Sequence, residues 1–178
     1  AMFATSGVTP PKRFVLAAKT YRFASTVIVP QSVGTHVVGQ GRIASVIKPD
    51  NGVTAFRFTT ANTHSMIWQG LGVEWATNQA TAVAWEVNCT TSGGSGVYFC
   101  TWDDVRVHRA GKGWATALGV GQQAYWACAW RDVTATHIGE SAFFFSPTTA
   151  VGMPELSFDS VYISNTGGGP TPTGPAIK

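Results

Sequence analysis

No stretch longer than ten residues in this chain repeats its apolar residues with a helical period. This feature limits the possible fold classes more than any other. Short runs instead alternate apolar and polar side chains, as strands with one buried face do. Residues 21–29 form such a run, which Pro30 ends. Turn sequences separate the runs, and Pro49-Asp50-Asn51-Gly52 is the strongest of them. The pattern predicts an all-β protein of roughly eight to ten strands.

Two of these runs form the expected centre of the fold. Their apolar positions alternate along residues 70–75 and 82–87, and these positions are Leu71, Val73, Trp75, Val83, Trp85 and Val87. Residues 76–80 are too short for a crossover connection, so we predict an antiparallel hairpin with buried aromatic side chains. Adding the other strands gives a two-sheet antiparallel jelly-roll sandwich in a single domain.

The 178 residues suffice for one domain with a full core. Residues 1–19, with two consecutive prolines, are predicted to form an N-terminal arm. Residues 20–164 form the sandwich, and residues 165–178 form a flexible tail rich in Gly, Pro and Thr. The charged fraction of 12% is about half the usual share, which favours a surface covered by partner molecules. No apolar run approaches the roughly 20 residues of a membrane-spanning helix.

The residues that carry catalytic or metal chemistry are sparse. The four histidines lie far apart in the sequence, and the three cysteines have no zinc spacing. Cys89 and Cys100 flank a turn and could face each other across a hairpin, but two buried thiols is the favoured interpretation; Cys128 is expected in the core.

Two pairs of acidic residues are the remaining candidates. Glu74 and Glu86 fall on facing strands and could act as the carboxylates of a glycosidase, although both lie opposite the large aromatic side chains and favour solvent. Asp103 and Asp104 could bind a calcium ion, or they could simply be hydrated. We therefore expect no enzyme.

The aromatic content, 7 Trp and 10 Phe, fits two functions besides packing a core. A carbohydrate-binding module presents exposed rings to sugars, whereas a self-assembling shell buries them between subunits. Three tryptophans fall at predicted strand ends or turns and are the candidates for surface positions: Trp68, Trp102 and Trp114.

Several segments, taken in order over roughly residues 20–164, resemble the jelly-roll coat proteins of small icosahedral positive-strand RNA viruses of the luteovirus, polerovirus and sobemovirus groups. These segments are the central hairpin, Val105-Arg-Val-His-Arg-Ala-Gly-Lys-Gly-Trp114, Phe143-Phe-Phe-Ser-Pro147, and Glu155-Leu-Ser-Phe-Asp-Ser-Val-Tyr-Ile163. The chain departs from the family in lacking its long arginine-rich arm.

The resemblance implies a structural coat protein of a virion, in which many copies form an icosahedral shell around genomic RNA. It assigns non-specific RNA contact to Lys12, Arg13, Lys19 and Arg22. It also implies calcium ions at subunit interfaces, with Asp103 and Asp104 as the first candidates and Asp132 and Glu140 as the next. No membrane partner is expected.

The alternative function is a carbohydrate-binding or lectin-like β-sandwich module of a phage fibre or a secreted hydrolase. The tail, which is similar to an interdomain linker, and the tryptophans favour it. A glycosidase that uses Glu74 and Glu86 is the third hypothesis.

Overall fold

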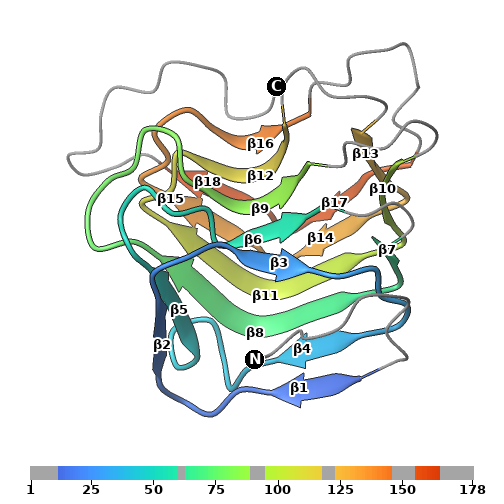
Figure 1. Ribbon diagram of the computed structural model, residues 1–178, viewed down its shortest axis with the longest axis horizontal. Coiled ribbons are helices and arrows are strands. Elements are labelled where there is room, and N and C mark those ends of the chain that lie inside the picture. Colours follow the sequence, from blue (N-terminus) through green and yellow to red (C-terminus); the bar gives the residue numbers. More distant parts are fainter. Residues whose placement is uncertain (1–11, 60–62, 89–94, 118–122, 146–154, 165–178) are drawn as a thin grey trace.

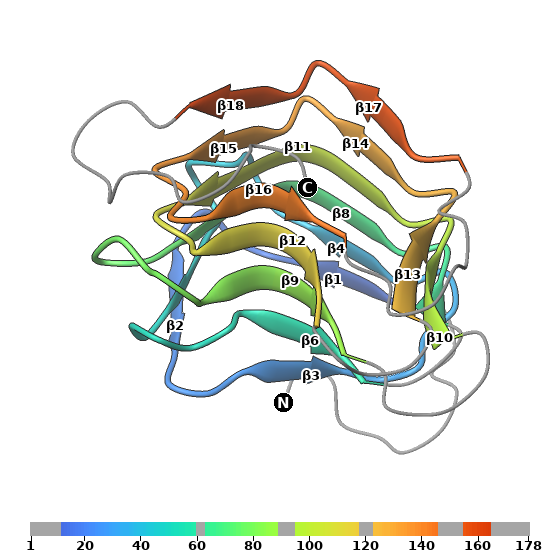
Figure 2. The ribbon, with the colours of Figure 1, turned by 90° about the horizontal axis from the view of Figure 1, so that it is seen from above.

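The computed structural model describes residues 12–59, 63–88, 95–117, 123–145 and 155–164, and every regular element in these ranges is a β-strand. The strands are arranged in a β-solenoid of about four turns, and every strand pairing among the described residues is parallel (Figures 1 and 2). The prediction of an all-β protein is confirmed. The described ranges contain no helix that could span a membrane.

The largest sheet has ten strands and forms two sides of each coil. One side carries β1 (Arg13–Val15), β4 (His36–Val38), the first half of β8 (Ile67–Glu74) and of β11 (Thr101–His108), β14 (Ala129–Arg131) and β17 (Ser157–Asp159). The other side carries β2 (Thr20–Phe23), β5 (Val46–Pro49), the second halves of β8 and β11, β15 (Thr134–Thr136) and β18 (Tyr162–Ser164).

Two smaller sheets close the coil. The five-stranded sheet consists of β3 (Val27–Val29), β6 (Phe56–Phe58), β9 (Val83–Val87), β12 (Lys112–Thr116) and β16 (Ser141–Phe144). The three-stranded sheet consists of β7 (Thr63–His64), β10 (Ser95–Tyr98) and β13 (Gln123–Trp126). Figure 1 places this small sheet on the opposite side of the molecule from β2 and β5, and Figure 2 agrees.

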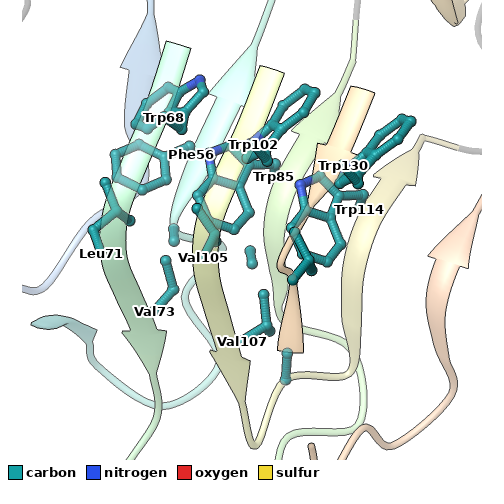
Figure 3. Close-up of a cluster of buried hydrophobic side chains, with 14 of the residues drawn as sticks. Phe56, Trp68, Leu71, Val73, Trp85, Trp102, Val105, Val107, Trp114 and Trp130 are labelled. Carbon is teal, nitrogen blue, oxygen red and sulfur yellow. The ribbon is translucent and has the colours of Figure 1, made fainter. Parts of the chain in front are cut away.

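Two columns of aromatic side chains fill the core, because in-register pairing places equivalent residues of successive coils on top of one another. The ten-stranded sheet contributes Trp68, Trp102, Trp130 and Phe158, and the five-stranded sheet contributes Phe56, Trp85, Trp114 and Phe143. Rings stack within each column: the Trp102 and Trp130 centroids are 5.2 Å apart, and those of Trp85 and Trp114 are 5.3 Å apart. Between the columns the rings meet edge to face (Figure 3).

The corners of the coil are columns of residues in the left-handed conformation. Before the ten-stranded sheet, φ lies between 47° and 61° at Ser65, Phe99, Ala127 and Glu155. At the bend within that sheet, Asp104, Asp132 and Ser160 adopt φ values between 48° and 54°. Each such residue turns the chain at the corner, and the side chains of the strand segments before and after it each alternate normally. Because the corners stack on one another, the strands of neighbouring coils stay in register.

One loop, residues 39–45, lies against the outside of β8. Its main chain bonds directly to the strand, from Gly39 N to Gln69 O (2.8 Å) and from Gly72 N to Ser45 O (2.9 Å). Gly72 makes this contact possible, because a Cβ added there would lie 2.4 Å from the Arg42 carbonyl oxygen. Arg42 then reaches later coils: the Asp104 carboxylate two coils further on (3.3 Å) and the Asp132 carbonyl three coils further on (2.7 Å).

The antiparallel jelly-roll sandwich predicted from the sequence is wrong. The two central runs do not bond to each other, because β8 belongs to the ten-stranded sheet and β9 to the five-stranded sheet. Their short connection is an arc rather than a hairpin: the two strands face each other through their side chains, and each bonds to the coils above and below. A short connection excludes a parallel pair only when both strands belong to the same sheet.

Some of the other predicted element boundaries differ from those in the structure, and one predicted turn is confirmed. The run predicted as one strand over residues 21–29 is divided into β2 and β3, which belong to different sheets. Residues 13–15, within the expected arm, form β1 and pair with β4. The turn at Asn51 and Gly52 is confirmed, with φ of 80° at Gly52. Residues 1–11 of the expected arm and the expected tail, 165–178, lie outside the described ranges.

Candidate functional site

The four basic residues expected to contact RNA lie on the outside of the first coil. Lys12, Arg13, Lys19 and Arg22 are all exposed, and the Lys19 ammonium is 5.0 Å from the centre of the Tyr21 ring. RNA contact by these residues stays a prediction.

Asp103 and Asp104, the predicted calcium ligands, are each engaged by a side chain of an earlier coil. Gln69 Nε2 donates to the Asp103 carboxylate at 2.8 Å, and Arg42 forms an ion pair with Asp104. Of the further candidates, Asp132 accepts a bond from Arg42 through its carbonyl, and Glu140 lies 3.1 Å from the Lys112 ammonium. The described residues contain no group of three or more His, Cys, Asp or Glu side chains able to hold a metal ion.

Glu74 and Glu86 do not form a carboxylate pair. Glu74 lies on β8 in the ten-stranded sheet, 3.4 Å from Arg106, and Glu86 lies on β9 in the five-stranded sheet, where it binds Arg57. Each carboxylate is thus neutralised by the guanidinium of a neighbouring coil. The two-carboxylate glycosidase mechanism has no support in this arrangement.

Cys100 stacks against Cys128 of the next coil. Both are buried free thiols, and burial raises the pKa of Cys100, with a further upward contribution from Cys128. The alternative in which Cys89 faces Cys100 across a hairpin involves Cys89, which lies outside the described ranges. A buried thiol with a raised pKa is a poor nucleophile, which indicates a packing role for Cys100.

A cluster of ionisable side chains lies at the end of β11. His108 Nδ1 is 2.8 Å from Thr136 Oγ1, and its ring meets that of His137 edge to face at 4.8 Å. Burial, followed by the positive charge of Arg106, lowers the pKa of His108 from 6.5 to about 4; Glu74 acts in the opposite direction. His108 is therefore neutral at physiological pH.

This shift predicts that the protein loses stability as the pH falls from 6.5 towards 4. In that window the unfolded chain binds a proton at His108 and the folded chain does not, whereas above pH 6.5 both states are neutral. After allowance for solvent screening at this partly exposed group, the loss is about 1 kcal/mol. Urea unfolding at several pH values should show this slope, and His108→Gln should remove it. His36→Gln, on β4, is the control and should leave it in place; an unchanged slope in His108→Gln would contradict the assignment.

The three tryptophans expected at the surface are core residues: Trp68, Trp102 and Trp114 are each 0% exposed. Strand ends and bends of a solenoid remain covered by the coils above and below, so they do not imply exposure. The aromatic side chains that reach solvent lie elsewhere: Phe99 is 65% exposed at the corner after the small three-stranded sheet, and Phe158 and Tyr162 are 41% and 60% exposed on β17 and β18.

Tyr98, Phe99 and Trp126 form what we call the aromatic patch. Val97 and Tyr125 point into the core at 0% exposure, so by alternation Tyr98 and Trp126 point outwards. Their rings stack at 6.1 Å between centroids. Phe99 follows at the left-handed corner and is 65% exposed.

Polar groups border the aromatic patch on the preceding coil. His64 is paired in register with Tyr98, and Ser65 occupies the corner position that corresponds to Phe99. Main-chain hydrogen bonds connect the successive coils here, from Ser65 N to Tyr98 O and from Phe99 N to Trp126 O, each 2.9 Å long. Beneath the patch, the buried Tyr125 hydroxyl donates to the Trp85 carbonyl at 2.8 Å. The patch therefore rests on a rigid base.

Sequence reasoning overlooked this patch, although residues 97–100 carry a usable signal. Val97, Tyr98, Phe99 and Cys100 are four consecutive large or apolar residues, and a strand can bury only alternate ones. Two of the four had to face outwards, and both are aromatic.

These observations define the protein as a parallel β-solenoid with a partly exposed aromatic patch on its three-stranded sheet and the corner after β10. The chain matches no protein-family model, and it shows no significant similarity to a curated protein or to a solved structure.

Proposed function

We propose that this protein is a carbohydrate-binding β-solenoid module and that the aromatic patch is its glycan-binding surface. A sugar ring has an apolar face of C–H groups and a rim of hydroxyl groups. Aromatic side chains match the apolar face, and His64 and Ser65 can exchange hydrogen bonds with the hydroxyl groups. Successive coils lie about 4.8 Å apart, so a glycan chain can contact equivalent positions on successive levels.

The conformation of Phe99 is the observation that carries this proposal. Its position requires φ near 54°, which costs a residue with a side chain about 1–2 kcal/mol, and 65% of the side chain remains in solvent. Gly34 takes a left-handed φ of 67° before β4, so the fold accepts glycine for such a turn. A phenylalanine that is both strained and exposed contributes little to stability, which favours a role in binding.

Replacing Phe99 should therefore separate binding from stability. Phe99→Ala and Trp126→Ala are each expected to weaken glycan binding about tenfold or more, as loss of an anchoring ring does. Phe99→Gly should lose binding equally while unfolding at the same or a higher denaturant concentration, with a gain of up to about 1 kcal/mol. Retention on insoluble polysaccharides and affinity electrophoresis with soluble ones measure the binding.

Tyr162→Ala is the matched control, since Tyr162 is 60% exposed on β18 in the ten-stranded sheet. It should bind as the unmodified protein does. If no polysaccharide retains the protein, or if Phe99→Ala and Trp126→Ala bind normally, the proposal fails.

The coat-protein function stays a prediction, but the jelly roll from which it was drawn has been replaced by a solenoid. The self-association that it requires is tested by size-exclusion chromatography, in which a shell elutes as a particle many times larger than the chain.

A further inference from the structure

A cavity lies beside β2 and β5. These two strands are on the opposite side of the solenoid from the small sheet that carries the aromatic patch (Figure 1). Its volume is about 260 Å³, and it is lined by Arg22, Lys48, Pro49, Asp50, Asn51 and Ala76. We call it the basic cavity. Drug-sized ligands occupy clefts of about 300–1,000 Å³, so this one suits a smaller molecule.

Two cations stand side by side in the basic cavity. Arg22 on β2 and Lys48 on β5 are paired in register, which puts their side chains on the same face of adjacent parallel strands. Within the described residues, neither side chain has a hydrogen bond or an ion pair. Like charges on neighbouring strands are destabilising, so stability of the fold does not account for the pair.

The remaining polar residues of the basic cavity are held by a rigid turn. Gln79 is 6% exposed; it accepts a bond from Gly52 N at 2.7 Å and donates to Asn51 Oδ1 at 3.1 Å. The Asn51 amide oxygen thus accepts a hydrogen bond from Gln79, and the Asn51 NH₂ group can donate to a ligand. The Asp50 carboxylate supplies an acceptor, and it disfavours ligands that carry more than one negative charge.

We propose that the basic cavity binds one acidic sugar unit through its carboxylate. Arg22 and Lys48 match a single carboxylate group, the first through a planar pair of N–H donors and the second as a point charge. Asp50 and Asn51 match the hydroxyl groups that a sugar acid carries beside its carboxylate. The cavity has the size of one such unit, and the site is independent of the aromatic patch.

Titration calorimetry of the whole chain with D-glucuronate tests this assignment. We expect saturable binding that high salt weakens, and binding that Arg22→Gln or Lys48→Met weakens about tenfold or more. Glucose, which has the hydroxyl groups without the carboxylate, should give no binding signal that Arg22→Gln or Lys48→Met removes. Inorganic phosphate, which has the charge without the sugar, should bind less tightly than glucuronate, and Asp50→Asn should narrow that difference.

Arg131→Gln is the matched control, because Arg131 is an exposed cation on β14 whose side chain has no ion pair within the described residues. It should bind glucuronate normally. The proposal is overturned if glucuronate does not saturate, if phosphate binds equally well, or if Arg131→Gln weakens binding as much as Arg22→Gln does.

Discussion

Replacing Trp102 with alanine is expected to lower the free energy of unfolding by about 3–5 kcal/mol. Trp102 is 0% exposed and contacts both aromatic columns: its ring stacks on Trp130 and meets Trp85 and Trp114 edge to face at 6.3 and 6.4 Å. Deleting it leaves a cavity whose walls belong to three coils, and the parallel strands prevent them from closing it. Guanidinium unfolding followed by circular dichroism measures the loss.

Trp102→Phe should cost much less, about 1 kcal/mol. Within the described residues, the indole N–H of Trp102 has no hydrogen-bond acceptor, so phenylalanine removes an unsatisfied buried donor along with part of the ring. Tyr162→Ala, at the 60% exposed site on β18, is expected to change stability by less than about 0.5 kcal/mol. A loss in Trp102→Ala as small as that of Tyr162→Ala would show that the columns do not hold the coils together.

Replacing Gly72 with valine should destabilise the protein by about 1–3 kcal/mol, because the new Cβ would lie 2.4 Å from the Arg42 carbonyl oxygen. The clash is between the new Cβ, whose position the main chain fixes, and a main-chain oxygen. No change of side-chain rotamer therefore relieves it. The loop of residues 39–45 must lift from β8, which breaks the bond from Gly72 N to Ser45 O. Urea unfolding gives the stability, and limited proteolysis should show faster cleavage in this loop.

Arg42→Ala is the companion variant to Gly72→Val. The Arg42 and Asp104 side chains are 39% and 43% exposed, so their ion pair is worth less than about 1 kcal/mol. A larger loss in Gly72→Val than in Arg42→Ala identifies the close main-chain approach as the cause. Equal stability of Gly72→Val and the unmodified protein would mean that the loop does not lie on the strand.

Much of the local structure could be predicted from the sequence. The inward positions of Leu71, Val73, Trp85 and Val87 and the turn at Asn51 and Gly52 were correct, because alternation and turn chemistry are local properties. The direction of strand pairing was not, since alternation is identical in parallel and antiparallel sheets. The connection over residues 76–80 looked like a hairpin only because both of its strands were assumed to bond to each other.

The repeat was hidden by its irregular length. Trp68, Trp102, Trp130 and Phe158 occupy equivalent positions, yet the separations between them vary from 28 to 34 residues. Sequence comparison at one fixed period cannot align them. The candidate sites were hidden for the same reason: Arg22 and Lys48 become neighbours only when the register of two coils is known, as do Tyr98 and Trp126.

The stacked arrangement also governs how the chain comes apart. Among the described residues, a coil in the middle packs against one neighbour on each side, whereas the first and last described coils pack against one described neighbour each, so these two coils should unfold before the central ones. Melting of such a stack proceeds as fraying inward, and its cooperativity depends on how strongly one layer of indole rings adheres to the next.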